Sequence, residues 1–374
     1  SAASDVYKRQ GEYSGFASNL ALGFKKLGCE VVILGNLDGW KKIDSGEGTI
    51  LYPVKNITIA GWTIRRTWMF SGIYSHFKYY LPNIKRFNAC FDVAIVVNYE
   101  FVRLDYEIWS SRISYNDLKK ILKKDGKIYL TACGNDMPYL KNASNLRYSP
   151  YSSIARNRYF ERRLMKLFDQ TLQNIRGVIP VMYDYAVAYR CIQKEYFVNV
   201  LPTIPLPINV DTFSYDNIIG NKIVIYHGKV SSVKGGKFII PALEKLQNLY
   251  PDKVEIVLHE KMPLQKYLME LPKANIVVDQ CLGYSYGMNA IYAMAMGKIV
   301  LSGNESECEQ EFGCKVPVVN ILPDSDDIFN KLEKLIMQPQ EVLSKMSLDA
   351  YNFVQGFHSD VLVAKQYLDI FSKY

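Results

Sequence analysis

Short apolar runs alternate with amphipathic stretches along most of this chain. Runs such as Val-Val-Ile-Leu are typical of buried strands, and we expect strands at residues 30–34, 93–97, 128–131, 177–181, 223–226, 254–258, 275–278 and 299–301. Apolar residues at helical spacing predict helices at residues 16–27, 184–194, 238–249 and 359–372, and a helix that closes at residues 119–124. Strands that alternate with helices in this way predict an α/β fold with parallel sheets.

A proline-rich segment interrupts this alternation in the middle of the chain. Residues 201–213 carry three prolines, which neither a helix interior nor a central strand accommodates. We therefore expect two domains, residues 11–212 and residues 213–356, joined by this linker. A chain of 374 residues is long enough for each domain to bury a core of its own.

The composition excludes several classes of protein. With 49% apolar residues and no run of ~18 uncharged apolar residues, the chain is typical of a soluble protein rather than a membrane-spanning one. Seven scattered cysteines without a C-x-x-C pair indicate reduced thiols in a cytoplasmic protein. The four histidines show no metal-ligand spacing, so we expect no metal site.

Positive charge is concentrated in the first half. Residues 11–210 carry 27 Lys and Arg against 16 Asp and Glu, whereas residues 211–374 carry 16 against 20. This split predicts an acidic partner for the first half, such as an anionic membrane surface or a phosphate-bearing acceptor, and no motif indicates nucleic acid. Basic and aromatic residues at 62–80 and 147–176 suit a lipid headgroup layer. A solvated helix face with core aromatics explains them equally well.

Two stretches of the second half predict a phosphate site. In residues 223–237 a strand ends at His227 and Gly228, and Lys229 and Lys234 follow. In residues 283–298 a glycine-containing turn opens a short Ala/Met helix, whose first residues are Gly287, Met288 and Asn289. Two cations and a helix N-terminus facing one crevice would bind a diphosphate. Solvated loop lysines are the alternative interpretation.

This pair of stretches resembles the C-terminal domain of GT-B glycosyltransferases, in particular the large retaining group called family 4. The strand–Gly–Arg–x4–Lys–Gly run of that family is matched by Gly228, Lys229, Lys234 and Gly235. Its Glu–x7–Glu–Ala–Met–Ala–x–Gly run is matched by Tyr284, Tyr292, Ala293, Met294, Ala295 and Gly297. Both family glutamates, which contact the donor sugar and the ribose, are therefore tyrosines here. A core-facing aromatic is the alternative for Tyr292.

The first half resembles the same family more loosely. Residues 129–136 are similar to its strand-end His-Gly-Ser/Thr-Asp motif, with Cys133 at the histidine position, followed by Gly134, Asn135 and Asp136. The resemblance places these residues on the acceptor side of the site, with Asp136 as an orienting group or base. A helix N-cap is the alternative for Asp136, and no histidine close in sequence would activate a Cys133 nucleophile. Gly15 belongs to a glycine loop that either touches the donor diphosphate or forms a simple tight turn.

The resemblance implies a GT-B fold with two Rossmann-like domains facing across a cleft, and a final helix, residues 357–374, that packs back on the first domain. It implies transfer of a sugar from a nucleotide-sugar donor to a glycan or lipid-linked acceptor hydroxyl, with retention and without metal or cofactor. The family acts most often in bacterial cell-surface polysaccharide biosynthesis, in the cytoplasm or at the inner face of the plasma membrane. The alternatives are a non-catalytic binding protein, since Cys133, Tyr284 and Tyr292 depart from the family, and a nucleotide-sugar epimerase using His227 and Asp136.

The first ten residues do not resemble the rest. Residues 5–10, Asp-Val-Tyr-Lys-Arg-Gln, match a translated transposon-end sequencing adapter. We expect residues 1–10 to be foreign and the native start, with the first strand, to be lost. An ordinary N-terminus is the alternative.

Overall fold

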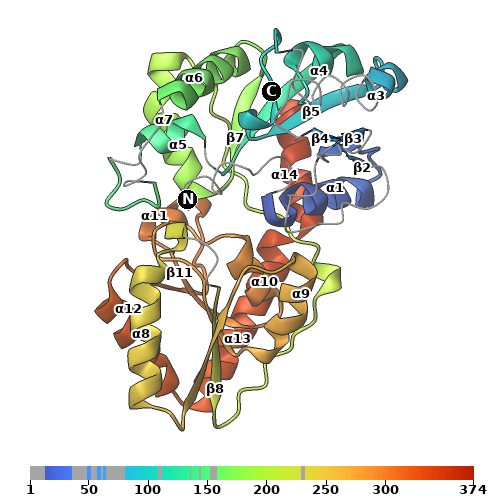
Figure 1. Cartoon of the computed structure of the whole chain (residues 1–374). Coiled ribbons are helices and arrows are strands. Elements are labelled where there is room, and N and C mark those ends of the chain that lie inside the picture. Colours follow the sequence, from blue (N-terminus) through green and yellow to red (C-terminus); the bar gives the residue numbers. More distant parts are fainter. Residues whose placement is uncertain are drawn as a thin grey trace.

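The computed structural model describes residues 13–35, 49–51, 57–59, 62–64, 81–107, 112–134, 136–142, 145–151, 158–228 and 232–374. It confirms the predicted α/β architecture with parallel sheets. Figure 1 shows two halves, one above the other. We call the half built on the described residues between 13 and 200 the first lobe, and the half built on residues 213–353 the second lobe.

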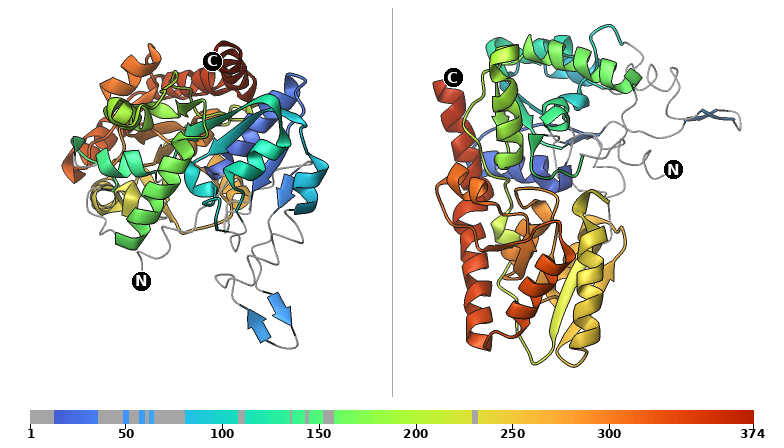
Figure 2. Two further views of the ribbon diagram at one scale, coloured as in Figure 1. Left: turned by 90° about the horizontal axis from the view of Figure 1, so that it is seen from above. Right: turned by 90° about the vertical axis from the view of Figure 1, so that its left-hand side faces the viewer.

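The first lobe is built around a parallel sheet in the order β5–β6–β7. Its strands are β5 (Phe91–Val97), β6 (Leu122–Ala132) and β7 (Gly177–Pro180). Two short pairs accompany it, β1 (Ile33–Gly35) parallel to β2 (Thr49–Leu51), and β3 (Ile57–Ile59) antiparallel to β4 (Trp62–Ile64). Figure 2 shows β3 and β4 projecting away from both lobes. The helices are α1 (Phe16–Lys26), α3 (Leu81–Arg86), α4 (Tyr115–Ile121), α5 (Met137–Asn142), α6 (Arg158–Leu172) and α7 (Met182–Tyr196), with 3-10 turns η2 (Tyr13–Gly15) and η5 (Tyr99–Phe101).

One predicted boundary in this lobe is wrong. Helix α4 ends at Ile121, and the residues assigned to its end, from Leu122 to Lys124, belong to β6. Leu122 is buried and pairs with Phe91 of β5. The backbone is therefore in an extended strand conformation where the charged residues suggested another helical turn. Tertiary pairing overrides local helix propensity here.

The second lobe is built around a parallel sheet in the order β12–β11–β10–β8–β9. Its strands are β8 (Ile223–Gly228), β9 (Val254–His259), β10 (Ile276–Val278), β11 (Ile299–Ser302) and β12 (Val318–Asn320). Its helices are α8 (Gly236–Leu249), α9 (Leu264–Glu270), α10 (Met288–Ala295), α11 (Ser306–Phe312), α12 (Ser325–Ile336) and α13 (Gln340–Phe353), with 3-10 turns η8 (Ser232–Lys234) and η9 (Leu271–Lys273). Ile225, Val278 and Leu301 of its central strands are fully buried, as their apolar runs predicted.

The chain crosses between the lobes twice. The linker, which includes the 3-10 turn η7 (Val210–Thr212), leads to the second lobe, and the π-helical turn η10 (Val354–His358) and α14 (Asp360–Lys373) lead back. Helix α14 lies beside α1 (Figure 1), where the rings of Tyr367 and Phe371 each have their centroids 6.2 Å from that of Phe24. Gly23 permits this approach, because a Cβ there would lie 2.1 Å from the Asp360 carbonyl oxygen.

An apolar hollow of about 560 Å³ lies between α1, β5 and α14. It flanks the edge of β5 that pairs with no strand among the described residues. The expectation of a lost first strand stays a prediction. None of the described helices is long and apolar enough to cross a bilayer.

Candidate functional site

A pocket of about 320 Å³ lies between the two lobes. It gathers residues that follow the carboxyl ends of strands: Glu100 after β5, Cys133 and Gly134 after β6, Gly228 at the end of β8, and Asp279 after β10. Ligands of open parallel sheets bind at this end of the strands, because successive βα turns converge there. The pocket is therefore the candidate site.

Lys234 is the predicted cation that the structure places in this pocket. It ends η8, and its Nζ lies 2.5 Å from Oδ1 of Asp279. The Lys234 side chain is 18% exposed and that of Asp279 is 1% exposed, so the ion pair forms part of the pocket wall. Lys229, the second predicted cation, lies outside the described residues. Asp279 balances the Lys234 charge, and sequence reasoning missed it, although its position directly after a strand was a usable signal.

The turn before α10 faces the same pocket. Gly287, Met288 and Asn289 all line it, and no side chain caps the helix that Gly287 precedes. The positive end of the α10 dipole is therefore presented to the pocket. The backbone N–H of Tyr284, earlier in this turn, donates to Oδ1 of Asp184 at 2.9 Å. Asp184, a buried first-lobe residue of α7, also lines the pocket and was missed by sequence reasoning.

The two tyrosines at the family glutamate positions bridge the lobes and do not line the pocket. The Tyr284 hydroxyl accepts the backbone N–H of Arg147 at 2.9 Å, and the Arg147 guanidinium lies 4.9 Å from the centre of the Tyr284 ring. The Tyr292 hydroxyl donates to the Ser14 carbonyl at 3.0 Å. Gly15 packs against Tyr292, because a Cβ at its φ of +91° would lie 2.3 Å from the tyrosine hydroxyl. The structure thus places Tyr284, Tyr292 and Gly15 at interlobe contacts, and Tyr292 and Gly15 lie next to the pocket-lining Ser14.

Asp136 and His227 lie behind the pocket wall. Asp136 is fully buried and directly precedes α5. Its Oδ1 accepts the Tyr139 N–H at 3.0 Å, which is the bond that an N-cap side chain makes. Burial raises the pKa of Asp136 to about 7. His227 is buried with Nδ1 2.8 Å from the Val278 carbonyl oxygen, and burial lowers its pKa. Asp136 therefore acts as the N-cap of α5. Because its side chain does not line the pocket, the structure offers no contact in support of a catalytic role.

The structure describes two of the three residues predicted to lie on the acceptor side. Cys133 and Gly134 line the pocket, and the Gly134 N–H donates to the Tyr185 hydroxyl at 2.8 Å. Asn135 lies outside the described residues. Glu100, which sequence reasoning missed, lines the same wall. Among the described residues, no group of three or more His, Cys, Asp or Glu is arranged to hold a metal ion.

The comparisons with known proteins are informative about the fold. No family model matches the sequence, and no curated protein matches it. Sucrose-phosphate synthase from Thermosynechococcus elongatus is similar in structure, with a TM-score of 0.60, 14% identity and coverage of 100% of this chain and 97% of that one. A glycosyltransferase from Rickettsia africae ESF-5 is similar with a TM-score of 0.54, 16% identity and coverage of 96% and 94%.

An alpha-glucosyltransferase in complex with UDP-glucose and DNA containing an abasic site is also similar, with a TM-score of 0.54, 14% identity and coverage of 97% of both chains. These neighbours are GT-B glycosyltransferases. The chain therefore has the predicted GT-B fold, with two Rossmann-like domains facing across a cleft.

Proposed function

We propose that this protein is a glycosyltransferase that moves a sugar from a nucleotide-sugar donor to an acceptor hydroxyl. The observation that carries the proposal is the pocket at the strand ends, where Lys234 and the uncapped N-terminus of α10 lie on the second lobe. A nucleoside diphosphate gains negative charge as it leaves. A fixed ammonium and a helix dipole stabilise that charge in the transition state.

Asp279 gives Lys234 a specific role in this proposal. The carboxylate holds the ammonium in place before the donor arrives, so little reorganisation is needed on binding. Asp279 also offsets part of the positive charge of Lys234. A simple anion that makes no other contact with the protein is therefore bound less well. We further propose that transfer proceeds with retention and without a metal ion, since Lys234 and α10 supply the positive charge.

We propose a glycan or lipid-linked saccharide as the acceptor, in cell-surface polysaccharide biosynthesis at an anionic membrane surface. Exposed basic residues support such a surface on the first lobe at α3 and α4, namely Lys85, Arg86 and Lys119, whereas the exposed Lys120 and Lys123 pair with Asp117 and Asp92. The basic stretches named from the sequence contribute less. Arg147 pairs with Glu305 and Glu307, Arg163 pairs with Glu107, and residues 65–80 lie outside the described residues.

A non-catalytic nucleotide-sugar-binding protein is the second candidate. The specific observation that favours it is the use of Tyr284 and Tyr292, at the family glutamate positions, for interlobe bonds. Such a protein would bind the donor in the same pocket without turnover. Release of nucleoside diphosphate therefore separates the two candidates.

The test is a binding and turnover assay with UDP-glucose, GDP-mannose and ADP-glucose. Isothermal titration calorimetry measures the affinity, and release of nucleoside diphosphate measures turnover. We expect Lys234→Ala to weaken binding at least tenfold. Lys237→Ala is the matched control, because it removes the same charge from an exposed position three residues along. Equal affinity of the two variants would show that the donor does not bind here.

A further inference from the structure

Glu100 is a carboxylate in the pocket wall, and the proposed sugar transfer has so far given it no role. It lies in η5, directly after β5, and lines the pocket on the first-lobe side together with Cys133 and Gly134. Its Oε1 atom is buried and has no hydrogen-bond partner among the described residues. A buried carboxylate oxygen without a partner is costly. A ligand hydroxyl in the pocket would satisfy it.

The backbone around Glu100 is held at several points. The Asn98 side chain accepts the Glu100 N–H at 2.8 Å and donates to the Cys133 carbonyl oxygen at 2.8 Å. The Glu100 carbonyl oxygen accepts from Nη1 of Arg112 at 2.6 Å. Asn98 therefore ties the residue to the end of β6, and Arg112 ties it to the loop before α4. The backbone that carries the Glu100 carboxylate is therefore held in place by the protein itself.

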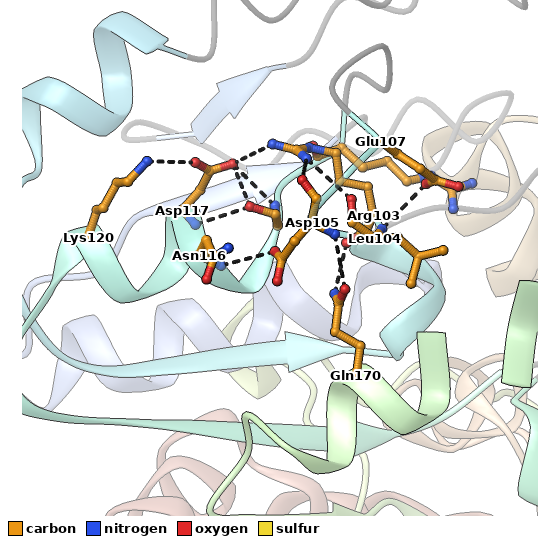
Figure 3. Close-up of polar contacts among 10 residues, drawn as sticks. Arg103, Leu104, Asp105, Glu107, Asn116, Asp117, Lys120 and Gln170 are labelled. Atoms are coloured by element: carbon orange, nitrogen blue, oxygen red, sulfur yellow. Dashed lines mark hydrogen bonds and ion pairs between the residues drawn. The ribbon is translucent and has the colours of Figure 1, made fainter. Parts of the chain in front are cut away.

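A buried polar network links Arg103 to described residues on either side of positions 108–111 (Figure 3). Nη2 of the buried Arg103 donates to Oδ2 of Asp117 at 2.9 Å, and its Nη1 donates to the Asp105 carbonyl oxygen at 3.1 Å. Its Nε donates to the Arg112 carbonyl oxygen at 3.0 Å. Arg103 thus fixes the residue that holds Glu100. A reacting group needs such support from its surroundings.

The charges around Glu100 keep it near the balance between its two protonation states. Burial raises the pKa of Glu100 to about 7, and the Arg112 and Arg163 charges oppose this rise. Asp136 and Tyr99 are the other titrating groups close to it, and the Glu100 charge helps to raise the pKa of both. A carboxylate that titrates near neutral pH is a better proton acceptor than an ordinary one.

We propose that Glu100 accepts the proton of the acceptor hydroxyl during sugar transfer, an inference that rests on the proposed function. The acceptor oxygen forms a bond to the anomeric carbon while the bond from that carbon to the diphosphate oxygen breaks. The electron pair of the broken bond leaves with the nucleoside diphosphate. The hydroxyl proton moves to the Glu100 carboxylate. The balance is the same for either stereochemical outcome.

The test uses Glu100→Gln, with water as the acceptor and UDP-glucose, GDP-mannose and ADP-glucose as donor probes. Glutamine keeps the size of the side chain and removes the proton-accepting charge. We expect at least a hundredfold slower release of nucleoside diphosphate, with donor affinity within twofold of the wild type. The wild-type rate should rise with pH to a plateau with a midpoint near 7, and the variant should lack this rise. Glu195→Gln, an exposed change on α7, is the charge control.

A second variant protects against a purely structural effect. Glu100→Asp keeps the carboxylate on a shorter side chain, so we expect a reduced rate that retains the pH-dependent rise. Thermal melting checks the folding of each variant. A Glu100→Gln rate within threefold of the wild type, or loss of donor binding in that variant, overturns the role of Glu100. Absence of donor binding and turnover in the wild type instead overturns the proposed function, and this inference with it.

Discussion

His358 should make the stability of this protein depend on pH through one buried ring. The ring is fully buried where the linker, the turn before α10 and α14 meet. Its Nδ1 lies 2.7 Å from the Leu206 carbonyl oxygen, so that nitrogen carries the proton, and its Nε2 lies 2.9 Å from the Tyr286 hydroxyl and accepts from it. Burial away from water favours this neutral form of the imidazole.

The magnitude follows from the pKa of the ring. Burial lowers the pKa of His358 from 6.5 to about 4. In the unfolded chain the ring binds a proton below pH 6.5, whereas in the folded protein it does so only below about pH 4. The contribution to stability is therefore present above pH 6.5 and is lost as the pH falls to 4. At 1.36 kcal/mol per pKa unit, the loss amounts to about 3 kcal/mol.

The assay is urea unfolding of the wild type and His358→Gln at pH values from 7.5 to 4. The quantity of interest is the difference in unfolding free energy between the two proteins. Glu100 and Asp136, whose pKa values are raised, act in the opposite direction but cancel in this difference. We expect the wild-type advantage to shrink by about 3 kcal/mol on acidification. Parallel curves would refute a buried, neutral His358.

Further substitutions test packing and polar contacts by thermal and urea unfolding. Gly15→Ala should cost about 1–3 kcal/mol, since φ is +91° and the new Cβ meets the Tyr292 hydroxyl, and Tyr292→Phe should recover part of it. Arg147→Ala should cost at most ~1 kcal/mol, because the Arg147 side chain is 56% exposed in its pairs with Glu305 and Glu307; a loss above ~3 kcal/mol would contradict this. Lys298→Met should cost about 1–3 kcal/mol by leaving the carbonyl oxygens of Asp216 and Pro272 without their donor. Burial lowers the Lys298 pKa to about 8, so the wild type should gain stability relative to that variant from pH 8 to 10.5, and no gain would contradict the buried ammonium.

Much of the fold was predictable from local patterns. The apolar runs at 223–226, 254–258 and 299–301 became β8, β9 and β11, because a strand covered on both faces needs apolar residues on both. The glycine turn before Met288 and the cation Lys234 were predictable because glycines and charges near strand ends stand out from the apolar background. Both line one pocket, whereas Lys229 lies outside the described residues.

The rest of the site could not be predicted in this way. Glu100 lies in η5, Asp184 in the first turn of α7 and Asp279 directly after β10, and nothing in the local sequence links these three acids until the fold brings them to one pocket. Tyr284 and Tyr292 stand at the positions of the two family glutamates in the sequence. Their hydroxyls bond to first-lobe groups more than a hundred residues away, which the sequence pattern does not indicate.

The sequence by itself determined the alternation of strands and helices and the glycine-containing turn before α10, because these depend on interactions between neighbours in the chain. The tertiary structure alone decided which acid pairs with Lys234, which carboxylate lines the first-lobe side of the pocket and which groups the tyrosine hydroxyls bond. Those outcomes depend on groups brought together from distant parts of the chain, and on burial that exists only when both lobes are folded.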